Sequence, residues 1–524
     1  MKHCLSVLWL LSLALATAKG QTWNESFVNE PQNLRYSSMN PTRLADNLLR
    51  DFAVADVQYC LAKGKFHAVD QSGDAHNVDA YIGGLRHIGR FDVAGHLRYS
   101  NQKEKNQIWN NTLWTNPRNP YIVCDSVPGD ATTEAFDLQT TAVYSFNTQW
   151  RIGGELGLRT GNRADQTDPR PQTTTSSIPV TIGADFQPSE TWGFGVSAGL
   201  RHFSSLVDYY NVQPLNNHTY FVMKGMGDYL QRLTVNESGY KREYTGTTYT
   251  AALNATWKGP DGRLADFLEV ALTTGDQDAR DGGTAYEFRG GDYSETRITV
   301  LNRFQFRPTP DVLHNLTLSV CTTDGKGKWS EQKREVDTEH GNLAYYRVLA
   351  TNTNHKIQQL TGSLVYQLDF LRNGQRNLYL RASGYFSQIT RKQLLGNATP
   401  KQEISLLSMD LQAGKCFAIH DVNLLTQLQG GYTHPLNKKF ATGSVYTDTK
   451  DITGTYTRPL FEYESSRQGH AGILIDANMP VGAKLAVGIY ATADCRLYMD
   501  KEEYWTGFKN KSLTTAQFGA YLRF

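Results

Sequence analysis

The chain ends in Thr515-Ala516-Gln517-Phe518-Gly519-Ala520-Tyr521-Leu522-Arg523-Phe524, and this stretch has the pattern of a single β-strand. Apolar residues occupy every second position, which is the period of a strand with one apolar face and one polar face. The apolar face consists of Ala516, Phe518, Ala520, Leu522 and Phe524. We therefore expect the chain to finish on a strand whose apolar face ends in an aromatic residue.

The same alternation recurs upstream, in runs that are long for a soluble protein. Clear examples are 150–159, 191–203, 360–370 and 484–498. Strands of soluble domains peak near about 5–6 residues, whereas a tilted strand that crosses a bilayer needs about 9–11. The lengths therefore favour strands that cross a membrane. We predict about 18 strands, with 16 as the alternative count, near 51–64, 78–88, 90–103, 133–148, 150–161, 177–187, 191–203, 243–257, 263–275, 287–307, 312–326, 355–370, 375–391, 402–416, 420–433, 464–479, 483–499 and 512–524.

Short and long connections alternate between these segments. The short ones, such as Gln187-Pro188-Ser189-Glu190 and Gly259-Pro260-Asp261-Gly262, carry the Gly, Pro and Asp residues of tight turns. The long ones fall near 104–132, 204–242, 327–354 and 434–463. If both ends of the barrel are periplasmic, every short turn is periplasmic and every long loop is extracellular, as in transmembrane barrels. The predicted fold is therefore an all-β, antiparallel, up-and-down transmembrane β-barrel.

The first residues have the pattern of an export signal. Lys2 precedes an apolar run over residues 5–16, and Ala18-Lys19-Gly20 offers small residues for cleavage near Gly20. We expect residues 1–20 to be a signal peptide and the mature chain to start at Gln21.

Two further parts of the chain are predicted. Residues 21–50 are polar and are expected in the periplasm or in the barrel mouth, and residues 51–524 form the barrel. The first part is too short for the large plug domain of an energised outer-membrane receptor. The formal net charge of +2 gives no electrostatic reason to expect a nucleic-acid partner.

A polar set of mid-strand residues is expected to face the barrel interior. Charges at these positions are costly unless they are solvated or paired, and a wet lumen solvates them. About 18 strands leave room for an aqueous channel unless loops or the N-terminal segment fill it. The predicted lumen-lining residues are Arg98, Arg151, Glu155, Arg159, Asp185, Arg201, Glu269, Arg303, Asp369, Arg381, Asp476, Asp494 and Arg496. Paired ladders that only hold the barrel together are the alternative role for each of them.

The sequence offers little for catalysis or metal binding. Asp276, Asp278 and Asp281 are weak candidates for Ca²⁺ ligands in an acidic, Gly-rich loop, and a solvated external loop is the alternative. His96 and His202 are expected on the lumen side near the upper strand ends, without an accompanying GxSxG or HExxH motif. We therefore expect no enzyme and no cofactor.

Loop 204–242 is rich in aromatic residues, which dominate the energetics of protein interfaces. These residues are Tyr209, Tyr210, Tyr220, Phe221 and Tyr229. The loop is therefore a candidate contact for a surface partner.

The last strand resembles the signal that the barrel-assembly machinery reads on outer-membrane proteins. Gly519, Leu522 and Phe524 match its Gly-x-x-apolar-x-apolar core, although Phe518 stands where a polar residue is usual. With the export signal, the Gln21 start and the Tyr- and Asn-rich strands, the whole mature chain resembles the uncharacterised outer-membrane barrel proteins of Bacteroidota. The resemblance implies a Gram-negative outer membrane, contact with its lipid, and an energised receptor or a surface lipoprotein as candidate partner.

Three functions remain open from the sequence. The first is a channel or uptake-associated barrel for small polar solutes. The second is a plugged barrel that binds a partner in a surface complex, and the third, less favoured, is an outer-membrane enzyme. An open lumen would favour the first function, and a plugged lumen would favour the second.

Overall fold

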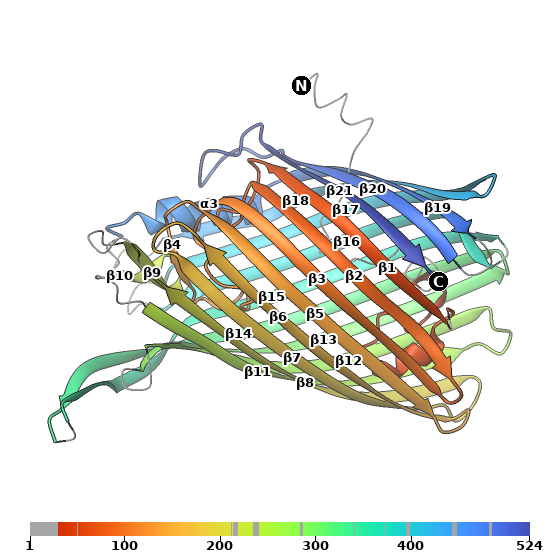
Figure 1. Ribbon diagram of the computed structural model, residues 1–524, viewed down its shortest axis with the longest axis horizontal. Coiled ribbons are helices and arrows are strands. Elements are labelled where there is room, and N and C mark those ends of the chain that lie inside the picture. Colours follow the sequence, from red (N-terminus) through yellow and green to blue (C-terminus); the bar gives the residue numbers. More distant parts are fainter. Residues whose placement is uncertain are drawn as a thin grey trace.

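The computed structural model describes residues 30–49, 51–210, 212, 218–233, 240–282, 287–339, 341–372, 374–394, 399–442, 448–481 and 485–524. Within these residues, eighteen antiparallel strands form one sheet, and β1 pairs with both β2 and β21, so the sheet closes into a barrel (Figure 1). The strands are β1 (Phe52–Gly64), β2 (Asp74–Ile88), β3 (Phe91–Gln107), β5 (Gly129–Ser145), β6 (Trp150–Asp165), β7 (Pro171–Phe186), β8 (Trp192–Tyr209), β11 (Tyr240–Lys258), β12 (Leu264–Asp281), β13 (Phe288–Thr309), β14 (Val312–Asp337), β15 (Leu343–Arg372), β16 (Gln375–Gln393), β17 (Lys401–Ile419), β18 (Val422–Ala441), β19 (Gln468–Val481), β20 (Leu485–Tyr498) and β21 (Ser512–Arg523). The predicted barrel and its count of 18 are confirmed.

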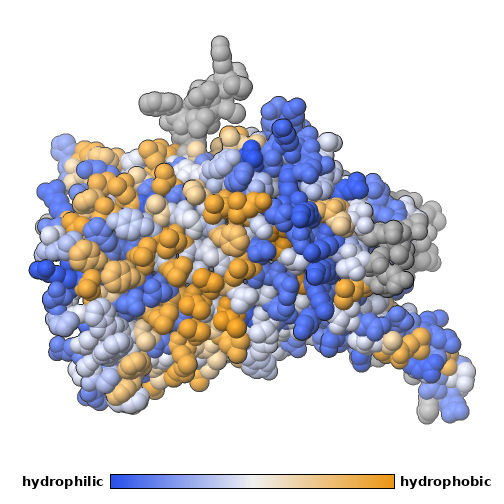
Figure 2. Space-filling model, turned by 180° about the vertical axis from the view of Figure 1, so that it is seen from behind, coloured by the Kyte–Doolittle hydropathy of each residue, from blue (hydrophilic) through white to orange (hydrophobic). Residues whose placement is uncertain are grey.

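The outer face of the barrel carries an apolar belt. Leu253, Leu411 and Ile489 are each more than 60% exposed, and further exposed Leu, Ile and Val residues continue the belt from strand to strand (Figure 2). An apolar surface of this extent is not stable in water, and a bilayer removes it from water. Closure of the sheet satisfies the backbone hydrogen bonds that hydrocarbon leaves without partners.

Aromatic side chains border this belt on both sides. Near the short turns, Phe146, Trp150 and Trp192 are exposed on the outer face. Further along the strands, Phe136 and Tyr249 are exposed on the same face. These two rows correspond to the aromatic girdles at the interfaces of transmembrane barrels.

One predicted loop is a pair of strands. The segment 327–354 was expected to be a long loop, but β14 and β15 run through most of it as a hairpin that projects beyond the barrel wall (Figure 1). The expectation was wrong because both faces of this ribbon lie outside the membrane. Their mixed polarity removes the alternation on which strand prediction depends.

The other predicted long loops contain local structure at the loop end of the barrel. Strands β4 (Val123–Asp125), β9 (Thr219–Gly225) and β10 (Asp228–Leu233) form a separate three-stranded sheet. The π-helical turn η2 (Thr453–Thr457) and helix α3 (Arg458–Ser465) lie beside it (Figure 1). We call these elements, together with residues 108–122, the lid.

The described part of the N-terminal segment contains the short 3-10 helix η1 (Pro41–Asp46). Asn40 begins it, and its side-chain oxygen accepts a hydrogen bond from the backbone N–H of Thr42, as an N-cap residue should. Among the described helices, none has the length and apolar composition needed to cross a bilayer. The predicted signal peptide, residues 1–20, lies outside the described residues.

Candidate functional site

The N-terminal segment 30–49 lies inside the barrel, at the end with the short turns. Helix η1 packs against the inner faces of β3, β5, β6 and β7 (Figure 1). We call residues 30–49 the plug, because they occupy the lumen at the level of the turns.

Arg35 is the centre of the contact between the plug and the wall. It is 8% exposed, and its guanidinium lies 2.5 Å from a carboxylate oxygen of Asp185 on β7 and 3.2 Å from one of Asp46 in the plug. The same guanidinium donates to the hydroxyl of Thr42 at 2.8 Å. Asp46 in turn accepts from Arg151 on β6 at 2.7 Å. A continuous network of ion pairs therefore joins the plug to the wall.

Two wall carboxylates hold the middle of the plug. Glu269 on β12 accepts hydrogen bonds from the Ser38 hydroxyl at 2.6 Å and from the Met39 backbone N–H at 3.0 Å. Glu155 on β6 lies 3.5 Å from Arg43. Buried carboxylates need such partners, because their desolvation is otherwise costly.

The opposite wall holds the start of the plug. Arg303 on β13 donates to the backbone carbonyl of Glu30, and Gln305 donates to that of Pro31 at 2.9 Å. Arg381 on β16 lies 3.1 Å from the carboxylate of Glu30. The plug thus spans the lumen, from β6 and β7 on one side to β13 and β16 on the other.

All thirteen predicted lumen residues fall on the face opposite the exposed apolar belt, and six of them bind the plug. Those six are Arg151, Glu155, Asp185, Glu269, Arg303 and Arg381. Others pair within the wall: Asp369 with Arg376 at 2.8 Å, Asp476 with the Tyr521 hydroxyl at 3.0 Å and Arg98 with Asp79 at 3.0 Å. Arg496 donates to the hydroxyl of Tyr463 in the lid at 3.2 Å.

The last three behave differently. Arg159 stacks over the ring of Trp114, with its guanidinium carbon 3.8 Å from the ring centroid. Asp494 is 3% exposed and has one carboxylate oxygen without a hydrogen-bond partner, and Arg201 forms no ion pair with any described residue. The side chain of Arg201 is exposed although it faces inward, so it projects into open lumen.

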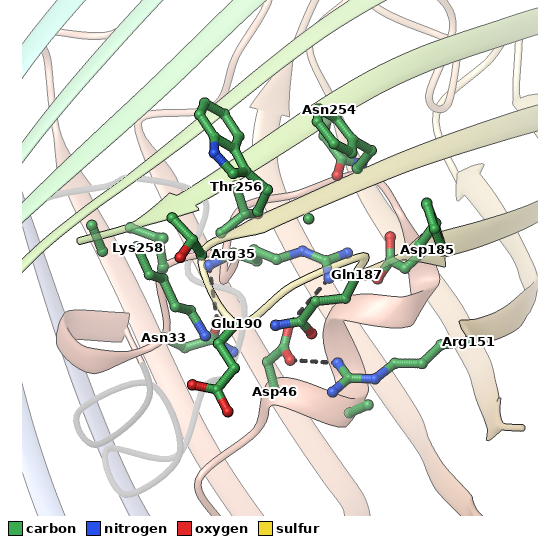
Figure 3. Close-up of a pocket in the computed structure, with 18 of the residues that line it drawn as sticks. Asn33, Arg35, Asp46, Arg151, Asp185, Gln187, Glu190, Asn254, Thr256 and Lys258 are labelled. Carbon is green, nitrogen blue, oxygen red and sulfur yellow. Dashed lines mark hydrogen bonds and ion pairs between the residues drawn. The ribbon is translucent and has the colours of Figure 1, made fainter. Parts of the chain in front are cut away.

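Polar cavities lie on both sides of the plug. A cavity of about 460 Å³ opens at the turn end, where Arg35, Asp46, Arg151, Asn254 and Lys258 line it (Figure 3). Asn254 is 7% exposed, and its amide nitrogen has no hydrogen-bond partner. We call this cavity the turn-end chamber.

A second cavity of about 640 Å³ lies between the plug and the inner face of β2, β3 and β5. His96, Arg98 and Asp137 line its wall, and Asn33 and Asn47 of the plug border both this cavity and the turn-end chamber. We call it the central chamber. The plug is therefore the partition between two wet compartments.

The lid encloses a third cavity, of about 400 Å³, at the loop end. Trp114, Arg118, His355 and Arg391 line this loop-end chamber. Arg118 reaches from the lid into the barrel and lies 2.8 Å from Glu295 on β13. The lid is thus tied to the wall in the same way as the plug.

The aromatic residues predicted to grip a surface partner mostly fold inward instead. Tyr209, Tyr220 and Phe221 are at most 4% exposed and form the apolar core of the lid, whereas Tyr210 is exposed. The expectation was wrong for these residues because β9 pairs with β4 and β10 and is covered on both faces. Tyr220 packs with Tyr209 of the barrel wall, and Phe221, on the opposite face of β9, packs with Trp109 and Ile452. Sequence composition alone does not show which face of a loop is covered.

Burial in the lid also changes the acidity of a carboxyl group. Asp125 in β4 is 5% exposed, and loss of hydration raises its pKa to about 6, although Asn111 donates a hydrogen bond to it at 2.6 Å. Burial likewise raises the pKa of Asp70, in the connection between β1 and β2, to about 6. Both groups gain protons in mildly acidic solution.

The candidate calcium ligands do not converge. Residues 276–281 belong to strand β12 and not to a loop, so successive side chains point to opposite faces. Asp281 is buried and paired with Arg242 at 2.5 Å, whereas Asp278 pairs with Arg280 at 3.1 Å. The described residues contain no group of three His, Cys, Asp or Glu side chains that could hold a metal ion.

One of the two histidines predicted to face the lumen points outward. His96 lines the central chamber, but His202 shares its face of β8 with the exposed Val196 and Leu200. Side chains alternate between the two faces of a strand, and Phe194, Val196 and Leu200 point outward. His202 lies an even number of residues from each of them, so it points outward too. The prediction assigned it to the wrong face, as a shift of one residue does.

Comparison with known proteins places the chain in a family. A model described as "Family of unknown function (DUF6850)" matches residues 41–524. The chain belongs to that family. No curated protein sequence matches this DUF6850 chain.

Solved structures resemble it only loosely. BauA, the ferric preacinetobactin receptor from Acinetobacter baumannii, matches with 10% identity and a TM-score of 0.41, over 91% of this chain and 80% of the receptor. The RagAB peptide transporter matches with 8% identity and a TM-score of 0.41, over 90% of this chain and 86% of the transporter chain. A Pseudomonas aeruginosa FadL homologue matches with 12% identity and a TM-score of 0.34, over 95% and 97%. The closed sheet and the apolar belt of the DUF6850 chain itself make it an outer-membrane β-barrel.

Proposed function

We propose that this barrel takes up small polar solutes through a lumen that the plug holds shut and that opens when the plug is displaced. The observation that carries the proposal is the chemistry of the plug contact, which consists of ion pairs and hydrogen bonds to six charged wall residues. The pairs Arg43–Glu155, Arg151–Asp46 and Arg381–Glu30 are partly exposed, so water and solute ions can replace them at small cost, unlike a packed apolar interface.

The series of cavities supports the same proposal. The loop-end, central and turn-end chambers lie along the barrel, and the lid and the plug separate them. A solute that entered past the lid would meet polar walls along its whole path. Only the plug would then stand between the central chamber and the periplasmic end.

Single-channel conductance of the refolded mature chain in a planar bilayer tests this. The intact chain should be mostly closed, and a variant that lacks residues 30–49 should conduct steadily. A matched control deletes residues 335–345 from the β14–β15 hairpin, which projects at the opposite end of the barrel from the plug (Figure 1), and should stay closed. A folded, heat-modifiable barrel without the plug that still shows no conductance would overturn the proposal.

A second candidate function is binding of a surface partner, and the β14–β15 hairpin favours it. Val336, Tyr345 and Leu349 are 42–56% exposed on this projecting ribbon (Figure 2). Among the described residues, the ladder of β13 with β14 ends at Lys328 and that of β15 with β16 ends at His355. An energised receptor or a surface lipoprotein could pair with such an edge. Co-purification of the intact chain with a partner, lost on deletion of 335–345, would support this function.

A further inference from the structure

Three arginines on alternate strands of the sheet, β3, β6 and β8, lie in one region of the inner wall. Arg98 on β3 pairs in register with Asp137 on β5, and Asp137 pairs in register with Arg159 on β6. Adjacent strands lie about 4.8 Å apart, so Arg98, Asp137 and Arg159 form one row across the wall, with the carboxylate between the two arginines. Arg201 on β8 lies on the same inner face, beyond β7. We call Arg98, Arg159 and Arg201 the arginine strip.

Two carboxylates, Asp79 and Asp137, lie near these three arginines, one fewer than neutrality of the strip would require. Asp79 lies 3.0 Å from Arg98, and Asp137, which stands between Arg98 and Arg159 in the register, also lies 3.8 Å from His96. Among the described residues, neither Arg159 nor Arg201 has an ion pair with a carboxylate. Most other inward-facing arginines that the structure describes do have one: Arg151 with Asp46, Arg163 with Glu104, Arg242 with Asp281, Arg297 with Glu295, Arg376 with Asp369, Arg381 with Glu30 and Arg391 with Glu464.

The strip also lies in the open part of the lumen. The side chains of Arg159 and Arg201 are exposed although they face inward, and Arg98 lines the central chamber. A guanidinium in such a position keeps its hydration until a ligand replaces it. Arginine recognises carboxylate and phosphate with paired N–H donors, and this geometry suits both anions.

Trp114 contacts the arginine strip from the side of the loop-end chamber. Its ring stacks on Arg159 and also lines the loop-end chamber. The ring packs so closely on the bare backbone of Gly161 that a Cβ there would lie 2.8 Å from it. A solute that passes from the loop-end chamber to the central chamber would therefore meet the edge of Trp114 first and the arginines next.

We infer that the solutes of this barrel are small oxyanions, bearing carboxylate or phosphate groups, which bind at the arginine strip on their way to the plug. The inference rests on the proposed function and names its substrate class. Two unpaired arginines, a third beside them and an aromatic ring stacked on one of them form a site that attracts anions and excludes polyamines and other cations.

Ligand binding to the refolded full mature chain tests this inference. The signal is tryptophan emission, because displacement of the Arg159 guanidinium alters the environment of Trp114. Citrate and inorganic phosphate are the probes, and spermidine is the cationic comparison. We expect saturable changes with one or both anions and none with spermidine. Citrate alone would assign carboxylates, and phosphate alone would assign phosphate groups.

Variants show whether the signal comes from the strip. Arg159→Gln with Arg201→Gln should raise the apparent Kd for the anion more than tenfold, and Arg159→Lys with Arg201→Lys should recover part of the affinity. The matched control, Arg289→Gln with Arg347→Gln, removes the same charge from side chains outside the lumen and should stay within twofold of the parent. Calorimetry on the Trp114→Phe variant should still detect the anion, because Trp114 supplies the fluorescence signal whereas the arginines supply most of the affinity.

Two outcomes would overturn the inference. One is anion affinity that is unchanged in the Gln double variant while heat-modifiability shows a folded barrel. The other is an absence of anion binding both in the intact chain and in the variant without residues 30–49, where access from the turn end is open. If the barrel without the plug conducts but binds no anion, the proposal of uptake through the lumen stands. Only the inference that the solutes are oxyanions is then wrong.

Discussion

At the scale of single residues, the ion pair between Arg242 and Asp281 is one of the two most deeply buried in the described wall, with that between Arg376 and Asp369. Arg242 has no exposed surface and donates two hydrogen bonds to Asp281, at 2.5 and 2.7 Å. Arg242→Met should lower the free energy of unfolding by about 3–5 kcal/mol, because it leaves a buried carboxylate without its partner. Thermal unfolding in detergent measures the change. Adding Asp281→Leu should restore most of the loss, and equal stability of the single and double variants would contradict this account.

The raised pKa of Asp125 predicts a pH dependence of the lid. A carboxyl group whose pKa in the folded protein lies above its unfolded value stabilises the fold fully below the unfolded pKa. That stability is lost as the pH rises through the folded pKa, which is about 6 for Asp125. The hydrogen-exchange protection factors of β4 and β9, which are corrected for the intrinsic pH dependence of exchange, should therefore be larger at pH 5 than at pH 7.5.

Asp125→Asn is the control for this prediction. This variant should reduce the pH dependence of protection in the lid. A smaller pH dependence of the same sign should remain, because the pKa of Asp70 is also raised. Protection factors that fall on acidification in the parent chain would show that other groups govern the lid.

At the scale of elements, the plug is held in part by partly exposed ion pairs, such as Arg43–Glu155 and Arg381–Glu30, which salt can screen. The screening length falls from about 10 Å at 0.1 M salt to about 3 Å at 1 M. We expect the open probability of the intact channel to increase several-fold over this range. Arg43→Gln with Glu155→Gln removes one partly exposed ion pair of the plug and should give a higher open probability at low salt with a weaker salt dependence. An open probability that is independent of salt would mean that packing, and not charge, retains the plug.

The projecting part of the β14–β15 hairpin should be dispensable for folding. Replacement of residues 335–345 by Asn-Gly joins Arg334 to Tyr346, which already pair in register, through a turn that hairpins favour. The melting temperature of the barrel should not change, and its stability should stay within about 0.5 kcal/mol, since the removed residues lie beyond the barrel wall. A large loss of stability would show that the ribbon supports the lid.

At the scale of the whole molecule, closure depends on the last residues of the chain. Ala53 and Phe524 exchange two backbone hydrogen bonds, at 2.8 and 3.0 Å, where β1 meets β21. The Phe524 ring is 51% exposed on the outer face, so it adds little to the packing of the finished barrel. Phe524→Ser should reduce the amount of assembled barrel in cells several-fold, while the melting temperature of the barrel that does form stays close to that of the parent.

That comparison separates assembly from stability. A matched control is Phe146→Ser, which removes a similarly exposed ring at the turn end and should leave the assembled amount nearly unchanged. Equal losses for the two variants would argue against a role of the C-terminal strand as an assembly signal.

The sequence by itself determined the eighteen strands, their order, their faces and the end at which the turns lie. Each of these follows from local chemistry, since alternation has a period of two residues and tight turns need particular residue types. The terminal pattern around Phe518 and Leu522 is one example, and both residues lie on the exposed outer face. His202 shows how little separates a correct assignment from a wrong one, because a shift by one position reverses the face.

Only the tertiary structure decided what fills the lumen. Inward charges have no local rule for choosing partners, and their partners come from distant parts of the chain: Arg381 pairs with Glu30, and Asp185 with Arg35. Conversely, the sequence does not show that Arg201 lacks an ion pair, because this depends on which inward-facing side chains the adjacent strands place near it. The plug, the lid and the arginine strip are consequences of closure, which brings residues hundreds of positions apart onto one inner surface.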